Sequence, residues 1–273
     1  MNPAQAIQVA ARRYCSEQHA DWANYYGTLP DDGRTPDGDY STEAYQTFPR
    51  YMTLNTICIE LERLDPDLLR DLSDTRSRII AAGECALDEM TNYTNPLAKQ
   101  ASQEERDKFC AYIERLTEDD LRGVAPLPYR HFVNSKEETR IRAALREHWG
   151  IEGGYWYPLT PRTNDNTEAF RYSTFVRALR GEVLQDAMRA RGIERYWCLD
   201  EFHDARIEST ERFETEYLGF EAFSTSESLD WIAYVSHEDS VTFGGWMLAI
   251  VQAEAPDWRE YLYNESYGIA HEG

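Results

Sequence analysis

The chain has 273 residues, and its 42% of hydrophobic residues, with 13% aromatic, are enough to build a large core. Acidic residues outnumber basic ones 49 to 28, which gives a net charge of −21. A surface of this charge repels the phosphate backbone of nucleic acids, so direct binding of DNA or RNA is disfavoured. The same charge suits a basic protein partner, because complementary charges speed association.

The cysteines indicate reduced thiols. Five of them are spread along the chain without a C-x-x-C pair: Cys15, Cys58, Cys85, Cys110 and Cys198. An odd, scattered set predicts neither a disulfide framework nor a zinc site. The first residues lack a signal-peptide core, and no run of ~18 apolar residues occurs. We therefore expect a cytoplasmic protein without membrane association, cofactor or resident metal, and its oligomeric state stays open.

The first 120 residues are expected to be helical. Ile7, Ala10, Ala11 and Tyr14 recur at helical spacing, as a buried stripe on one face requires. Residues 27–40, "GTLPDDGRTPDGDY", crowd Gly, Pro and Asp together and predict a long exposed loop. Further helical spacing is found at 52–64, at 68–90 and around 109–116. This part of the chain, residues 1–120, reads as a helical layer.

A helix and a short strand are expected at the start of the remaining segment, 121–273. Ser135 precedes Glu138 by three residues, the spacing of a capping box, and Gly150 ends the apolar stripe that follows. "YWYPL", residues 155–159, reads as a short strand with Tyr155 and Tyr157 on the same face. Two more helices are expected, at 169–179 and 183–191.

From residue 195 onward the pattern predicts an antiparallel sheet. "RYWCLDEF", "YLGFEAFSTS", "DWIAYVS" and "SVTFGG" are rich in aromatic and β-branched residues, and "SHEDS" is a hairpin signal. "WMLAIVQ" fits a strand or a buried helix equally, and "DWREYLY" reads as an amphipathic helix. The fold class is therefore α+β, with a helical N-terminal layer and a C-terminal domain built on a mainly antiparallel sheet. Whether these form one domain or two stays open.

The C-terminal segment resembles uncharacterised bacterial proteins of the immunity type, which are associated with polymorphic toxins. The resemblance rests on "PLPYRHF", a helix ending in Trp149, "GGYWYPL" and the late "SHEDSVTFGGW". It covers roughly the last 150 residues and implies a setting of bacterial self-protection rather than an activity. These motifs contain no catalytic pattern, so no functional residue is carried over.

Candidate catalytic residues are few. The signatures of phosphate-binding loops, dinucleotide folds, zinc proteases and nucleophile elbows are missing from the sequence. Two clusters, "DEFHD" and "SHED", combine imidazole with carboxylates at expected strand ends and could serve acid–base chemistry or a divalent metal. They supply His203, His237, Glu201, Asp204 and Glu238. Against this, "SHED" also reads as an ordinary hairpin turn.

Two further pairs are better explained by structure than by chemistry. Glu84 and Asp88 are four apart on an expected helix, but no E-x-x-H motif accompanies them, so a solvated helix surface is favoured. Cys15 precedes His19 by four residues without a known nucleophile pattern. Cys58 and Cys198 lie in apolar runs, and buried thiols are the favoured interpretation.

Partner-binding candidates come from the aromatic stretch at 148–159 and from the acidic loop. We expect Trp149 and Trp156 to be core residues, which leaves Tyr155 and Tyr157 as binding candidates, since tyrosine is common at binding hot spots. The loop adds four carboxylates on a flexible segment able to reach a partner: Asp31, Asp32, Asp37 and Asp39.

Two functions of different classes follow. The favoured one is a non-enzymatic, acidic binding protein, with an immunity protein that neutralises a basic toxin domain as its specific form. The alternative is a small hydrolase or metal-dependent enzyme that uses His203, His237 and the neighbouring carboxylates. A third hypothesis is a mimic of nucleic acid, which requires a continuous acidic stripe.

Overall fold

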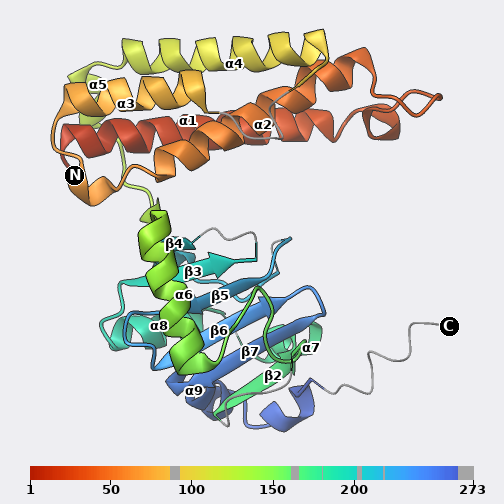
Figure 1. Ribbon diagram of the computed structural model, residues 1–273, viewed down its shortest axis with the longest axis vertical. Helices are drawn as coiled ribbons and strands as arrows, with labels where there is room; N and C mark the ends of the chain where they lie inside the picture. Colours follow the sequence, from red (N-terminus) through yellow and green to blue (C-terminus); the bar gives the residue numbers. More distant parts are fainter. Residues whose placement is uncertain (87–92, 161–165, 180, 202–204, 218, 264–273) are drawn as a thin grey trace. The chain divides into compact units, whose positions relative to one another are not determined.

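The computed structural model describes the chain except for residues 87–92, 161–165, 180, 202–204, 218 and 264–273. It separates into two compact units, Met1–Leu127 (unit 1) and Pro128–Gly273 (unit 2). Unit 1 is helical, and the sheet belongs to unit 2 (Figure 1). This arrangement confirms the α+β class. No helix in the described ranges combines the length and the apolar character that crossing a membrane requires.

The described helices of unit 1 are α1 (Pro3–Tyr26), α2 (Thr42–Glu62), α3 (Leu72–Cys85), α4 (Pro96–Arg115) and α5 (Glu118–Arg122). The start of α1 is set by a capping box, in which Asn2 and Gln5 exchange side-chain to backbone hydrogen bonds. Its apolar stripe packs against α2 and α4 around Ile7, Leu54 and Phe109. The expected helical layer is confirmed, although α3 ends at Cys85 and not at residue 90.

The expected loop between α1 and α2 is exposed, as predicted, but it is well ordered by hydrogen bonds. Its centre is a 3₁₀ turn at Pro30–Gly33, and a β-bridge joins Arg34 to Tyr40. Asp39 accepts a hydrogen bond from the hydroxyl of Tyr45 at 3.0 Å. The segment is therefore a structured turn that holds its aspartates at the surface.

The described residues of unit 2 form a seven-stranded antiparallel sheet in the order β1-β4-β3-β5-β6-β7-β2. The strands are β1 (Arg130–Phe132), β2 (Thr167–Arg171), β3 (Arg195–Asp200), β4 (Ala205–Ser209), β5 (Ala222–Thr225), β6 (Trp231–Ser236) and β7 (Ser240–Gly245). Strands β6 and β7 pair with Ser236 opposite Ser240, so "SHEDS" is the hairpin turn that the sequence predicts.

Helices cover both faces of this sheet. The helix α6 (Ser135–Trp149) packs on one face through Ile141 and Leu145. Three helices cover the other face: α7 (Tyr172–Ala178), α8 (Gly181–Ala190) and α9 (Trp246–Glu254). The interior strand β6 is consequently buried on both faces, which explains the apolar run of its first five residues, Trp231 to Val235. Figure 1 shows α6 running across the strands of unit 2.

Several local expectations for unit 2 are wrong. Residues 155–159 form a turn and not a strand. The strand in this region is β2, Thr167–Arg171, which overlaps the first residues of the helix expected at 169–179, whereas α7 and α8 confirm the rest of that helix and the next one. "DWREYLY" contains only a short 3₁₀ helix, Trp258–Tyr261. The ambiguous "WMLAIVQ" is the helix α9.

The prediction for the start of α6 is wrong, and the prediction for its end is confirmed. The side chain of Asn134, and not that of Ser135, caps the helix by accepting hydrogen bonds from the backbone amides of Lys136 and Glu137. At the other end Gly150 adopts a left-handed conformation with φ of 69°, as predicted. The turn that leaves α6 therefore starts at Gly150 and leads into the aromatic stretch.

Candidate functional site

The aromatic stretch divides into core and surface. Trp149 and Trp156 are buried and pack edge to face, with ring centroids 6.2 Å apart, so their predicted core role is confirmed. Tyr155 is 50% exposed. Tyr157 is only half-buried, packs against the core and accepts a hydrogen bond on its carbonyl from Thr242. The two tyrosines do not share a strand face, because this segment is a turn, and Tyr155 is the one that remains available at the surface.

Three strand ends bring carboxylates and an imidazole together beside Tyr155. Glu201 follows β3, Glu221 precedes β5 and His237 follows β6, and these strands are neighbours in the sheet. The backbone amide of Glu201 donates to the carbonyl of Glu221 at 3.0 Å. The amide of Glu221 in turn donates to Oε1 of Glu201 at 3.1 Å. Strand pairing therefore fixes the two glutamates side by side.

His237 is bonded to a fully buried carboxylate. Its Nδ1 lies within hydrogen-bond distance of Oε1 of Glu221, and its Nε2 lies 3.1 Å from Oε1 of Glu238. The Glu221 side chain is 0% exposed and that of His237 is 47% exposed. Oε2 of Glu221 is buried without a hydrogen-bond partner among the residues that the structure describes. His237 is therefore more than a turn residue, since it partners a buried acid.

The environment raises both pKa values of this pair. Burial raises the pKa of Glu221, and the hydrogen bonds from His237 counteract this only in part. For His237 burial lowers the pKa, but the hydrogen bond to Glu221 and the charges of Glu221 and Glu238 outweigh it, and the pKa is raised. The pair as a whole retains protons more strongly than the free side chains do.

Two tyrosines accompany these acids at the surface. The hydroxyl of Tyr155 lies 3.5 Å from Oε2 of Glu201. Tyr217 is 37% exposed, and its pKa is raised by partial burial and by the negative charges of Glu201 and Glu221. We call this group the sheet-end cluster: Tyr155, Glu201, Tyr217, Glu221, His237 and Glu238.

The surroundings of the cluster are acidic. Residues 201–239 contain no lysine and only two arginines, Arg206 and Arg212. Arg206 is buried, whereas Glu214, Glu216 and Asp239 are exposed. The exposed charge of this segment is therefore predominantly negative.

Arg206 belongs to a buried ionic network. Its guanidinium lies 3.1 Å from Oδ2 of Asp200 and 3.4 Å from Oε1 of Glu208, and Glu208 also accepts a hydrogen bond from the hydroxyl of Tyr196 at 2.9 Å. Buried charges that compensate each other in this way need no bound ligand, because each is the partner of the other. Asp200, part of the "DEFHD" motif, therefore has a structural role.

The catalytic constellation expected from sequence is only partly described. His203 and Asp204 lie outside the described residues, so their distance from His237 stays untested. Glu201 and Glu238 both lie close to the His237–Glu221 pair. Within the described ranges, no group of three or more His, Cys, Asp or Glu side chains is arranged to hold a metal ion.

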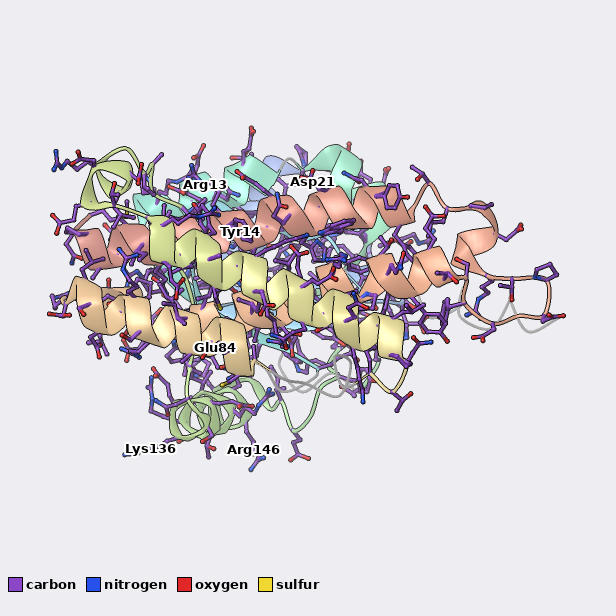
Figure 2. The ribbon with its side chains drawn as sticks, turned by 90° about the horizontal axis from the view of Figure 1, so that it is seen from above. Arg13, Tyr14, Asp21, Glu84, Lys136 and Arg146 are labelled. Carbon is purple, nitrogen blue, oxygen red and sulfur yellow. The ribbon has the colours of Figure 1, made fainter. Side chains whose placement is uncertain are left out.

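The remaining sequence candidates lie elsewhere. Asp31, Asp32, Asp37 and Asp39 are exposed in the loop of unit 1. Glu84 is exposed near the end of α3 (Figure 2), and Asp88 lies outside the described residues. The expectation that both acids share one helix face therefore falls partly outside the described residues, and α3 ends at Cys85.

The thiols fit a structural role. All five cysteines are free thiols in the structure. Cys15 and Cys198 are buried as predicted, and Cys58 is only half-buried. Burial raises the pKa of the Cys15 and Cys198 thiols, which disfavours the reactive thiolate.

Sequence reasoning missed Glu221 and Tyr217. Glu221 interrupts the apolar run "GFEAF", and an acidic residue inside a strand-like run is a usable signal of a buried, partnered carboxylate. Tyr217 has no such signal, because its neighbourhood is set by pairing of β3 with β5.

Comparisons of the chain with protein-family models, with curated proteins and with solved structures found no match.

Proposed function

We propose that this chain is a non-enzymatic, acidic binding protein that captures a basic protein, in the manner of an immunity protein covering a toxin domain. The observation that carries the proposal is the sheet-end cluster, where the exposed Tyr155 and Tyr217 lie near Glu201 and where Glu238 contacts the exposed imidazole of His237. The net charge of −21 supports it.

The chemistry of the cluster suits lysine and arginine side chains of a partner. Tyrosine buries a large area on binding, loses few rotamers and keeps a polar hydroxyl, which is why it is frequent at hot spots. The surrounding carboxylates attract a basic protein over long range and penalise acidic competitors. Hydrogen bonds between the strand ends keep Glu201 and Glu221 in place before binding, which lowers the entropic cost.

The test uses the protein domain encoded beside this gene, titrated against the purified chain by calorimetry. The parent chain is expected to bind it, and the double variant Tyr155→Ala, Tyr217→Ala is expected to weaken binding by roughly tenfold or more. The matched control is Tyr25→Ala, since Tyr25 is similarly exposed but lies on unit 1. If no neighbouring gene encodes a binding protein, the immunity proposal is wrong.

The acidic loop of unit 1 is a second candidate surface for the same function. Changing Asp31, Asp32, Asp37 and Asp39 to asparagine removes four negative charges and no bulk. If this loop steers the partner, the association rate falls on this change, and more so at low salt. An unchanged rate leaves the sheet-end cluster as the binding surface.

A second function is favoured by one observation, the bond between His237 and buried Glu221. A half-exposed imidazole oriented by a buried carboxylate is an arrangement suited to general acid–base catalysis by way of water. The neighbouring Ser236 hydroxyl is buried, so it does not serve as a nucleophile. Hydrolysis of p-nitrophenyl acetate or bis-p-nitrophenyl phosphate by the parent, lost in His237→Gln, would reverse the ranking of the two functions.

A further inference from the structure

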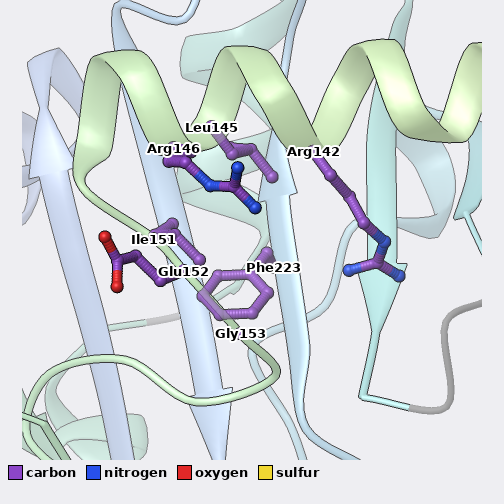
Figure 3. A pocket seen from close by; sticks show the side chains of 7 residues that line it. All are labelled: Arg142, Leu145, Arg146, Ile151, Glu152, Gly153 and Phe223. Atoms are coloured by element: carbon purple, nitrogen blue, oxygen red, sulfur yellow. The ribbon is translucent and has the colours of Figure 1, made fainter.

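Unit 2 has a pocket between α6 and the turn that follows it (Figure 3). Its volume is about 230 Å³. The residues that line it are Arg142, Leu145, Arg146, Ile151, Glu152, Gly153 and Phe223. This volume is below the range of about 300–1,000 Å³ typical of drug-sized ligands, so the pocket suits a molecule built on a single ring.

The inner wall of the pocket is apolar and rigid. Phe223 belongs to β5 and stacks on Tyr234 of β6, with ring centroids 4.6 Å apart. Leu145 and Ile151 are buried in the same core cluster. Phe223, Leu145 and Ile151 are only 1%, 2% and 5% exposed, so they close the bottom of the pocket as an apolar floor.

The two arginines of the pocket differ in their partners. The guanidinium of Arg142 is held by Glu138 at 2.7 Å and lies 3.5 Å from the carbonyl of Asp200. Arg146 is exposed and lines the pocket together with Phe223 (Figure 3). Within the part of the chain that the structure describes, no hydrogen bond or ion pair of its side chain is present.

We propose that this pocket binds a small monocarboxylate with a flat apolar body. The carboxylate pairs with the guanidinium of Arg146, whose planar fork matches its two oxygens, and the apolar body enters the pocket toward the floor formed by Leu145, Ile151 and Phe223. The inference goes beyond the proposed function and does not depend on it.

The charge balance selects a monoanion. Arg142 is already neutralised by Glu138, and the carboxylate of Glu152 stands at the rim, so Arg146 alone supplies uncommitted positive charge. A phosphate dianion meets an excess of negative charge from Glu152 and from the acidic chain as a whole. A neutral ligand leaves the arginine unpaired and gains only the apolar contact.

The experiment titrates benzoate into the full chain and follows saturable binding by calorimetry. Benzoate is expected to bind the parent, and Arg146→Gln is expected to raise its Kd by roughly tenfold. Lys136→Gln is the matched control. Lys136 is exposed on the same helix, and its substitution removes the same charge at a position outside the pocket (Figure 2). Arg146→Lys keeps the charge but loses the fork, so its Kd should lie between those of the parent and Arg146→Gln.

Three ring compounds separate the ligand classes. Phenylphosphonate and benzyl alcohol should both bind more weakly than benzoate, and acetate should too, because it lacks the ring. Tighter binding of phenylphosphonate would overturn the monocarboxylate assignment, and equal binding of benzyl alcohol would overturn the role of the anion. Absence of saturable benzoate binding, or an equal Kd in a folded Arg146→Gln variant, would overturn the proposal itself. Circular dichroism of each variant establishes that it is folded.

Discussion

Truncation to alanine is expected to lower the stability strongly at Trp156 and hardly at all at its neighbour Tyr155. Trp156 is 1% exposed and packs against Trp149 and Tyr234, whereas Tyr155 is 50% exposed. Trp156→Ala leaves a cavity under α6 that the surrounding sheet cannot close, while Tyr155→Ala removes a side chain that is half in solvent.

The magnitudes follow from these exposures. Truncation of a buried tryptophan costs about 3–5 kcal/mol, a large part of a domain stability of about 5–15 kcal/mol. With about 2–4 °C of Tm per kcal/mol for a domain of this size, the expected drop is about 6–20 °C. Tyr155→Ala is expected to stay within about 0.5 kcal/mol of the parent.

Thermal melts followed by circular dichroism measure both variants. The reasoning is refuted if Trp156→Ala melts like the parent, because the tryptophan would then not be part of the core. A loss of stability in Tyr155→Ala as large as that in Trp156→Ala would also refute it, since the tyrosine would then be structural and not a binding residue.

Three further predictions concern charge, packing and capping. Because the pKa of His237 is raised in the folded protein, its protonation stabilises the fold at pH values below 6.5, the ordinary pKa of histidine, and this contribution is lost as the pH rises through the raised pKa. His237→Gln should therefore make the free energy of unfolding, measured by denaturant titration, less dependent on pH in this range. Gly83→Ala places a Cβ 2.6 Å from a ring carbon of Phe109 and should lower the stability of unit 1 by about 1–3 kcal/mol; a normal melt would contradict this packing. Asn134→Ala removes the cap of α6 and should cost about 1 kcal/mol, whereas Ser135→Ala should cost less.

The elements that sequence predicts well are those whose apolar period agrees with their burial. The stripe of α6 ends at Gly150, which supplies the left-handed cap, and the β6–β7 hairpin has strand-like runs on both sides of a polar turn. In both cases local preference and tertiary packing favour the same structure, so a single sequence is enough to predict the element.

The elements that sequence misses depend on long-range partners. In β4 the alternate residues Arg206 and Glu208 are charged, and the sequence alone predicts them at the surface. In the structure both are buried, because Arg206 pairs with Asp200 and with Glu208. Residues 155–159 have strand-like composition, but their backbone turns so that Trp156 fills the core. Tertiary packing overrides local propensity at both places.

The candidate site was predicted only in part for the same reason. His237 was found from its sequence cluster, but its partner Glu221 stands 16 positions earlier in the chain and reaches it through the pairing of β5 with β6. The composition of the aromatic stretch points to Tyr155, but not to its neighbour Glu201. The two meet because the backbone of Gly154 packs against Glu201, so closely that a Cβ added to Gly154 would lie 3.4 Å from the Cβ of Glu201.

The most direct test of the central claim is the association rate between this chain and the basic domain encoded beside its gene, measured by stopped flow at low and high salt. Electrostatic capture predicts a rate that falls steeply as salt rises, with a smaller change in the dissociation rate. In the double variant Tyr155→Ala, Tyr217→Ala the dissociation rate should rise while the association rate stays close to that of the parent. An association rate that does not depend on salt, or a dissociation rate unchanged by the loss of both tyrosines, would contradict binding of a basic partner at the sheet-end cluster.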